Sequence, residues 1–288
     1  KQDLIYNKLF KGSGPAQPYL NYALYLLIYY CPDEANVDES LKKKNINKLK
    51  TMTFFPYSYD VKYRLSPIEN FTSLHELDID LSSFDLDYLK LEDVLKNSSV
   101  VKMRLNNAEV GGWLKNFPQL EYLSAGQHGV SAAAKNLHVF EYLTNLEELE
   151  INCPDSENID FLKNCVKIKK LNLDLRGNYS VASKVKNIDA LKHLTILEEL
   201  DIKVPENKQL ESFSHEGLSY CKKLKNLIIN SDAATNVLAN LKSCSALEKL
   251  DLKSKDEFNI SLSTSNFYGL NKFVKLKRIK LDDTTFKF

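Results

Sequence analysis

The chain has 288 residues, of which 43% are hydrophobic and 27% are charged, so it can bury a core and is not expected to be wholly disordered. Its 39 Lys and Arg residues nearly balance 38 Asp and Glu residues, and a net charge of +1 argues against nucleic acid or an anionic membrane as the main partner. The length allows two ordinary domains or one elongated repeat domain.

Residues 1–45 are predicted to form an N-terminal helical cap. The segments LIYNKLF, from Leu4, and YLNYALYLLIYY, from Tyr19, predict two helices, and Pro18 suits the start of the second one. Repeat domains need a cap over the open core of the first repeat. The five tyrosines of the second helix leave a docking helix for a partner as the alternative. The apolar stretch from Tyr19 to Cys31 is about 13 residues long, which is too short to span a bilayer.

Residues 46–288 are predicted to form about ten repeats. One phrase returns ten times, about every 25 residues: an apolar residue, two variable ones, an apolar residue, a variable one and an apolar residue. Its second half alternates with period two, which predicts a short strand with one apolar side. The ten copies begin at Leu49, Leu74, Val100, Leu120, Leu146, Ile168, Leu197, Leu224, Leu247 and Leu276.

The segments before the phrases have helical spacing. Ile159, Leu162, Cys165 and Ile168 follow one another at intervals of three residues, and the next copy repeats this pattern. Each unit is therefore predicted to contain a strand, a loop and a helix. One unit cannot bury its apolar side alone, but stacked neighbours can.

The phrase resembles that of the leucine-rich repeat family, LxxLxLxxN/C, over roughly residues 46–284. The resemblance implies an α/β solenoid with a curved parallel sheet inside and helices outside. The ninth position departs from the family, because the usual Asn is replaced, so we expect irregular loops whose backbone groups bond to water or local turns. That position holds Ser82, Ala108, Pro154, Arg176, Pro205 and Asp232.

Three of the five cysteines, Cys165, Cys221 and Cys244, stand three residues before the phrase, where other copies have Phe, Leu or Ile. The position is therefore predicted to be buried. It resembles the cysteine-containing repeats of F-box/LRR adaptors of ubiquitin ligases, although the N-terminal helices lack the Leu-Pro opening of an F-box. The alternative is that Cys fills the core as a small hydrophobic residue. The odd number and wide spacing of the cysteines predict reduced thiols and an intracellular protein, cytoplasmic or nuclear.

We predict no catalytic residue, no metal site and no cofactor, and therefore a non-enzymatic protein. None of the five histidines lies in a metal-binding or hydrolase motif. Adjacent carboxylates such as Glu147 and Glu148 would point to opposite faces of a strand, so they cannot act as a pair in one pocket.

The variable third, fifth and seventh positions of the phrase are expected to face out from the concave side of the sheet and to bind a protein partner. Stripes of alternating charge suit a protein of complementary pattern, and Tyr122 and Ile228 are candidate anchors. The alternatives are a substrate-recognition subunit of an F-box-type ubiquitin ligase and a structural subunit of a multi-subunit complex. The candidate partner-binding residues are Glu76, Asp78, Asp80, Lys102, Arg104, Tyr122, Glu148, Glu150, Asp174, Glu199, Asp201, Lys203, Asn226, Ile228, Lys249, Asp251, Arg278 and Lys280.

Three smaller features also carry expectations. Trp113, the only tryptophan, is expected to pack into the helical side of the repeat, with Gly111 and Gly112 allowing the chain to bend. The last segment, DDTTFKF after Leu281, is expected to fray. Asn97 belongs to one of four Asn-x-Ser/Thr sequences, which chance alone explains in a chain of this composition.

Overall fold

The computed structural model separates into two compact units, residues 1–129 and 130–288, and each is considered by itself. The predicted helical cap, residues 1–45, lies outside the described residues, so it stays a prediction. The structure describes residues 49–54, 71–80, 96–106, 110–125, 136–176, 183–204, 213–230, 234–253, 273, 275–281 and 284–287.

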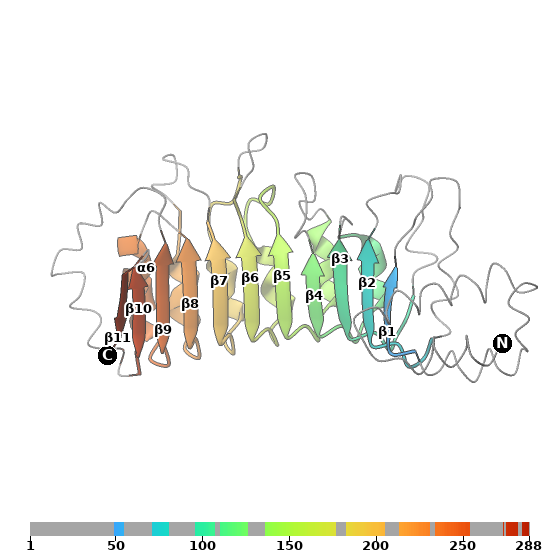
Figure 1. Ribbon diagram of the computed structural model, residues 1–288. Coiled ribbons are helices and arrows are strands. Elements are labelled where there is room, and N and C mark those ends of the chain that lie inside the picture. Colours follow the sequence, from blue (N-terminus) through green and yellow to red (C-terminus); the bar gives the residue numbers. More distant parts are fainter. Residues whose placement is uncertain are drawn as a thin grey trace, which may run out of the picture. The chain divides into compact units, whose positions relative to one another are not determined.

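The first unit holds four parallel strands that pair in chain order (Figure 1). The strands are β1 (Thr51–Phe54), β2 (Glu76–Asp80), β3 (Lys102–Asn106) and β4 (Tyr122–Ala125). A short 3-10 helix, η3 (Gly112–Asn116), precedes β4. Trp113 of this helix is only 4% exposed and meets Phe117 edge-on, with ring centroids 6.0 Å apart. Trp113 is therefore buried on η3, as its expected packing into the helical side of the repeat requires.

The second unit holds six parallel strands in chain order, followed by one antiparallel strand (Figure 1). The parallel strands are β5 (Glu148–Asn152), β6 (Lys170–Asp174), β7 (Glu199–Lys203), β8 (Asn226–Asn230), β9 (Lys249–Lys253) and β10 (Arg278–Leu281). Each of the ten parallel strands in the two units begins at the third residue of one of the ten phrases. The predicted parallel sheet of repeats is confirmed.

The C-terminal segment does not fray as expected. Strand β11 (Thr284–Lys287) pairs antiparallel with β10, and Thr284 lies opposite Leu281. The expectation was wrong because β10 would otherwise leave its backbone donors and acceptors unpaired, and a reversed segment can pair with them.

Where the structure describes the segments between strands, they are mostly 3-10 helices, whereas the sequence predicted helices without fixing their type. The i, i+3 spacing explains this, because three residues make one turn of a 3-10 helix. The backbone N–H of Leu162 donates to Ile159 (3.0 Å), that of Cys165 to Leu162 (2.9 Å) and that of Ile168 to Cys165 (3.1 Å). Within the described residues of the second unit, these helices are η4 (Leu137–Tyr142), η5 (Asp160–Asn164), η6 (Asp189–His193), η7 (Glu216–Tyr220) and η8 (Leu241–Ser243), and the α-helix α6 (Ala234–Asn240) precedes η8.

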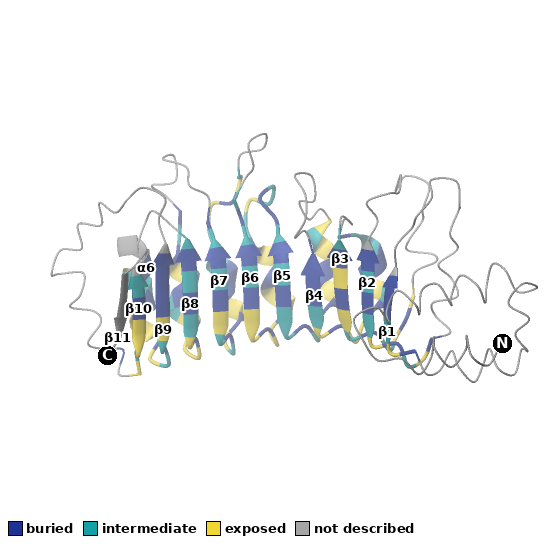
Figure 2. Cartoon of the chain, in the orientation of Figure 1, coloured by how far each residue is buried: buried dark blue, intermediate teal, exposed yellow. Residues whose placement is uncertain are grey.

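The first, fourth and sixth residues of the phrases build the core: wherever the structure describes their burial they are buried, except Leu276, which is partly buried. In the copy at Leu146, the side chains of Leu146, Leu149 and Ile151 are at most 4% exposed. Figure 2 shows buried segments alternating with partly or fully exposed ones along β6 and β7. Period-two alternation therefore separates a buried side of each strand from a polar side.

The residues directly after β5, β6 and β7 continue the backbone pairing of the sheet. The N–H of Cys153 donates to Asp174 (3.0 Å), that of Leu175 to Lys203 (2.8 Å) and that of Val204 to Asn230 (3.1 Å). Backbone hydrogen bonds thus continue one residue beyond β5, β6 and β7. The loop residues that follow β6 and β7, 177–182 and 205–212, lie outside the described residues, so irregular loops whose backbone groups bond to water or local turns stay a prediction.

The position three residues before the phrase is buried, as predicted, and its Cys and Asn side chains donate hydrogen bonds to the preceding repeat. The Sγ atoms of Cys165 and Cys244 lie 3.5 Å and 3.3 Å from the carbonyl oxygens of Phe140 and Leu218. Asn97 occupies the same position, is 3% exposed and donates Nδ2 to the Phe71 carbonyl at 3.1 Å. A buried, hydrogen-bonded amide is not accessible for glycosylation in the folded chain.

Candidate functional site

The polar strand face, meaning the side of the sheet that carries the third, fifth and seventh residues of each phrase, is the candidate site. In the second unit the strand register aligns these residues into rows. The third-position row runs Glu148, Lys170, Glu199, Asn226, Lys249 and Arg278 from β5 to β10. The fifth-position row runs Glu150, Asn172, Asp201, Ile228, Asp251 and Lys280.

A groove of about 240 Å³ lies on this face across β5 to β8. It brings together six of the predicted residues and adds two, Lys170 and Asn172, which the candidate set omitted although they hold the same phrase positions. Leu149, Leu171 and Leu200 contribute to the lining between them. The eight residues of the two rows that line the groove are Glu148, Glu150, Lys170, Asn172, Glu199, Asp201, Asn226 and Ile228.

The groove is acidic. Among its described lining residues there are four carboxylates and one ammonium group. That ammonium, Nζ of Lys170, lies 3.1 Å from Oε1 of Glu148. The hydrogen bond and charge of Glu148, together with the charge of Glu199, raise the pKa of Lys170. Lys170 therefore stays protonated, and its positive charge offsets part of the negative charge of Glu148 and Glu199 in the same row. No basic residue of the fifth-position row lines the groove.

The seventh-position candidates Asp174 and Lys203 interact with each other rather than standing apart. The Asp174 carboxylate accepts hydrogen bonds from Nη2 of Arg176 at 2.8 Å and from Nζ of Lys203 at 3.4 Å. Burial alone would raise the pKa of Asp174, but the hydrogen bonds and charge of Arg176, helped by Lys203, outweigh it and lower the pKa. These groups have their charges balanced within the chain.

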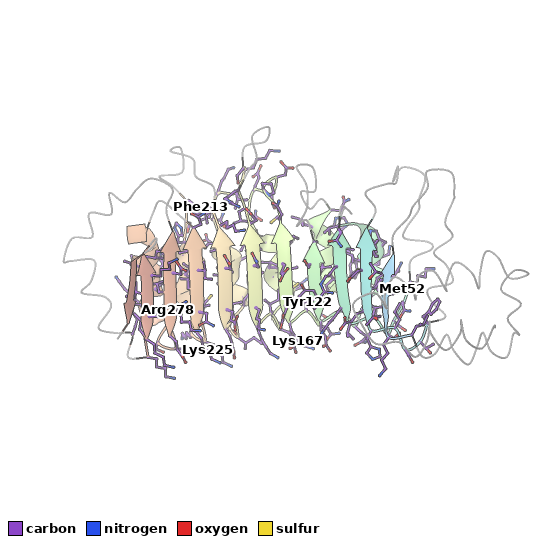
Figure 3. The ribbon with its side chains drawn as sticks, in the orientation of Figure 1. Met52, Tyr122, Lys167, Phe213, Lys225 and Arg278 are labelled. Carbon is purple, nitrogen blue, oxygen red and sulfur yellow. The ribbon has the colours of Figure 1, made fainter. Side chains whose placement is uncertain are left out.

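The candidates of the first unit also pair among themselves. Lys102 lies 3.4 Å from Glu76, and Arg104 lies 3.2 Å from Asp78. The guanidinium of Arg104 lies over the ring of Tyr122, 5.4 Å from its centroid, which is a cation–π geometry. Tyr122, labelled in Figure 3, is therefore an aromatic support for Arg104. The side chain of Asp80 lies outside the described residues.

The remaining candidates lie on β8, β9 and β10. Lys249 and Arg278 are exposed, and Ile228 and Lys280 are partly buried. Asp251 was expected to face solvent and does not, because it is only 9% exposed. Its short carboxyl lies between the longer side chains of Ile228 and Lys280 in the strand register. Its Oδ1 atom is buried and has no hydrogen-bond partner in the described part of the chain.

A ladder of charges at the second phrase position was missed from the sequence. It runs along the end of the sheet from which the strands start, where Figure 3 labels Lys225. Three of its pairs have N–O distances of 2.7 Å. The hydrogen bond and charge of Lys225 lower the pKa of Glu198, and those of Lys277 lower the pKa of Glu248. The ladder alternates in sign through Glu147, Lys169, Glu198, Lys225, Glu248 and Lys277.

The described residues contain no group of three or more His, Cys, Asp or Glu side chains placed to hold a metal ion. In the same part of the chain, no helix is both long and apolar enough to cross a membrane. Burial lowers the pKa of His215, which lies beside Phe213 with ring centroids 4.9 Å apart and does not border the groove.

Comparison with known proteins shows the fold. No protein-family model matches the sequence, and no curated protein matches it either. One similar solved structure is an internalin, InlF, of Listeria monocytogenes, with a TM-score of 0.54 and 16% identity over 86% of this chain and 65% of that chain. Internalin C2 of the same organism has a TM-score of 0.46 and 18% identity over 66% of this chain and 74% of that chain. A leucine-rich-repeat protein of Leptospira interrogans has a TM-score of 0.48 and 16% identity over 85% of this chain and 54% of that chain. The chain thus spans 65% of the length of the InlF chain. It has the leucine-rich-repeat fold that its sequence resembles.

Proposed function

We propose that this chain is a non-enzymatic protein-interaction module that binds a partner protein on the polar strand face. The observation that carries the proposal is the groove of about 240 Å³ on the second unit, which is lined by polar residues from four adjacent strands. The strands hold these side chains in fixed rows, because their backbones are hydrogen-bonded and their apolar sides are packed. A rigid, hollowed surface that combines charged side chains with the apolar groups of Leu149, Leu171, Leu200 and Ile228 suits a polypeptide ligand.

The charge of the groove argues for a polypeptide rather than a polyanion. Four carboxylates among the lining residues would repel phosphate groups. The ion pairs elsewhere on the face, such as Asp78 with Arg104, fix the side chains in the first unit and leave the groove as the better-defined binding surface.

Several finer predictions remain open. These are the role as substrate-recognition subunit of an F-box-type ubiquitin ligase, membership of a multi-subunit complex and an intracellular location. Recovery of a cullin-type scaffold with the purified chain would support the first of them. The buried thiols of Cys165 and Cys244 suit that role and a simple core-filling role equally.

The proposal is tested by two double variants of matched charge. Asn172→Arg with Asn226→Arg places two long cations in the groove, whereas Asn164→Arg with Ser243→Arg places them on exposed residues of η5 and η8. Affinity purification with quantitative mass spectrometry compares both variants with the wild-type chain, and melting temperatures confirm that all three are folded.

We expect the proteins enriched by the wild-type chain to be lost from the groove variant and retained by the η5/η8 variant. If the groove variant retains them, or if both variants lose them equally, the strand face is not the binding surface.

A further inference from the structure

The start edge of the second unit, meaning the end of the sheet where β5 to β10 begin, alternates between acidic and basic repeats. The charge ladder at the second phrase position places a Glu directly before β5, β7 and β9 and a Lys directly before β6, β8 and β10. Figure 3 labels Lys167 and Lys225, which lie at this edge. The edge therefore changes sign from each strand to the next.

The residue before each phrase follows the same alternation. In the three basic repeats it is a second lysine, and in the three acidic repeats it is a neutral residue. The lysines are Lys167, Lys223 and Lys275, and the neutral residues are Asn145, Ile196 and Ala246. Each basic repeat thus brings two lysines to the edge, and each acidic repeat brings one carboxylate.

The ladder charges stay exposed although they pair along the ladder. Nζ of Lys225 lies 2.7 Å from a carboxylate oxygen of Glu198, yet the two side chains are 46% and 39% exposed. Lys169 and Glu147 are exposed to a similar extent. Each charge keeps an open side, so opposite charges of another molecule can approach it.

A ladder of six charges that alternates in sign is complementary to its own reverse. When a second copy meets the edge with its strand order reversed, β5 lies opposite β10 of that copy, β6 opposite β9 and β7 opposite β8. Every ladder Glu then faces a ladder Lys. The pairs, each of which occurs twice, are Glu147 with Lys277, Lys169 with Glu248, and Glu198 with Lys225. This arrangement has a two-fold axis perpendicular to the sheet, between β7 and β8.

The residues before the phrases fit the same arrangement. Reversal places each of their lysines opposite a neutral residue, so no two lysines of this row meet. The pairs are Lys275 with Asn145, Lys223 with Ile196, and Lys167 with Ala246.

The third-position row lies one residue farther along each strand and fits less fully. It brings Glu148 opposite Arg278, but it also brings Lys170 opposite Lys249. The charge of Lys170 is offset within its own chain, because its Nζ lies 3.1 Å from Oε1 of Glu148. The complementarity therefore belongs to the edge itself.

Other arrangements of two edges bring like charges together. A two-fold axis along the ladder would set each strand opposite its own copy, Glu147 on Glu147 and Lys169 on Lys169. A shift of the reversed arrangement by one strand would also set Glu on Glu and Lys on Lys. Like charges in contact are unfavourable, so the ladder specifies both the axis and the register.

We propose that the start edge is a self-association surface, on which two copies of this chain pair edge to edge about the axis between β7 and β8. Five steps of about 4.8 Å make the contact about 24 Å long, and a single edge of this length buries less than the about 800 Å² per partner of a standard interface. Exposed ion pairs are individually weak and are screened by salt. The association is therefore weak, concentration-dependent and salt-sensitive. It goes beyond the proposed function, whose groove is lined by other residues.

Sedimentation equilibrium of the full chain tests whether it associates. At about 20 mM NaCl, we expect the weight-average mass to rise with protein concentration from 33.0 kDa toward twice that value, and at about 500 mM NaCl to stay near 33.0 kDa. A mass that stays at 33.0 kDa at low salt, or a rise that salt does not reduce, would overturn the proposal.

Matched variants test whether the ladder is responsible. An acidic-ladder variant carries Lys169→Glu, Lys225→Glu and Lys277→Glu. Its control has the same change of charge on exposed residues of η5, η6 and η8, namely Lys163→Glu, Lys192→Glu and Lys242→Glu. The acidic-ladder variant should remain monomeric, and the control should associate within about threefold of the wild-type chain. Equal association of the two variants would contradict a role of the ladder.

A mixture separates loss of complementarity from loss of folding. A basic-ladder variant carries Glu147→Lys, Glu198→Lys and Glu248→Lys and should also be monomeric. Mixing it with the acidic-ladder variant should restore association, because every facing pair again has opposite signs. Absence of association in a mixture of two variants that are folded by circular dichroism would contradict the proposal.

Crosslinking of the wild-type chain tests the axis and requires no variant. Glu147 and Lys277 are separated by five strand steps, about 24 Å, within one chain, so a zero-length carbodiimide crosslink cannot join them there. In the proposed dimer they face each other. We expect this crosslink at low salt and its loss at high salt, as measured by peptide mass spectrometry. If the chain associates but Glu147 and Lys277 are not joined, the proposed arrangement is wrong.

Discussion

Replacing Leu173 by Ala tests the assignment of the two faces of β6. Leu173 is fully buried and lies in register between Ile151 on β5 and Ile202 on β7, so it belongs to two repeat interfaces at once. The change removes three carbon atoms, for which transfer alone gives ~2.4 kcal/mol at ~0.8 kcal/mol per methylene. The cavity left between two packed repeats adds to this, so we expect a loss of ~3–4 kcal/mol of unfolding free energy.

The assay is urea unfolding followed by circular dichroism. With a denaturant slope of about 3 kcal/mol/M, the midpoint for Leu173→Ala should fall by about 1 M. The control is Asn172→Ala, one residue earlier and on the opposite face, which should change the free energy by no more than ~0.5 kcal/mol. If the two variants unfold at the same urea concentration, Leu173 is not in a packed core and the assignment of faces is wrong.

Three further predictions concern the buried side chains of the repeats. Burial lowers the pKa of His215 to about 4, so lowering the pH from about 6.5 toward 4 protonates this histidine in the unfolded chain first and should remove about 3 kcal/mol of stability. His215→Ile copies Ile159 and Ile188 in the equivalent places and should reduce the loss over this pH range by about that amount, leaving the part due to carboxylates; equal losses in the two proteins would contradict the account. A methyl group on Gly217 would overlap the Ile188 carbonyl oxygen, so Gly217→Ala should cost ~1–3 kcal/mol. It should cost more than Gly111→Ala, where the nearest atoms belong to the side chain of Trp113 and not to the backbone, and the reverse order in thermal unfolding would be inconsistent with this packing. Burial raises to about 11 or 12 the pKa of the thiols of Cys153, Cys165, Cys221 and Cys244. Iodoacetamide at mildly alkaline pH should therefore label them only after unfolding, as measured by peptide mass spectrometry, and labelling of the native chain would refute their burial.

The repeat architecture could be predicted from the sequence because its cause is local. Each phrase alternates with period two, and each strand starts at the third residue of its phrase, as Glu148 does after Leu146. Position within the phrase also predicted burial, from Leu149 in the core to Glu150 on the polar strand face. These features depend only on the order of apolar and polar residues along one strand.

The rest depends on contacts between repeats that the order of residues does not determine. The i, i+3 spacing from Ile159 to Ile168 suits a 3-10 helix, but an apolar stripe with residues three and four apart is also typical of an α-helix. The pairing of Asp78 with Arg104 required the register between β2 and β3. The burial of Asp251 follows from its neighbours across two strands, which no pattern within its own phrase indicates.

The groove itself was predicted only in part. Glu150 and Asp201 were expected on the polar strand face, but their distance along the row depends on the register of β5, β6 and β7. That register places Asn172 between them, so the three side chains share one row of the groove.

Site-specific photocrosslinking tests the central claim, that the polar strand face of the second unit binds a partner protein, most directly. The photoreactive amino acid p-benzoylphenylalanine replaces Asn172 in the groove or, as the control, Asn164 on η5. After irradiation in cells, crosslinks to other polypeptides are identified by mass spectrometry. We expect adducts from position 172 and none from position 164. Adducts from position 164 alone would contradict the account, because the partner would then contact the 3-10 helices and not the strands.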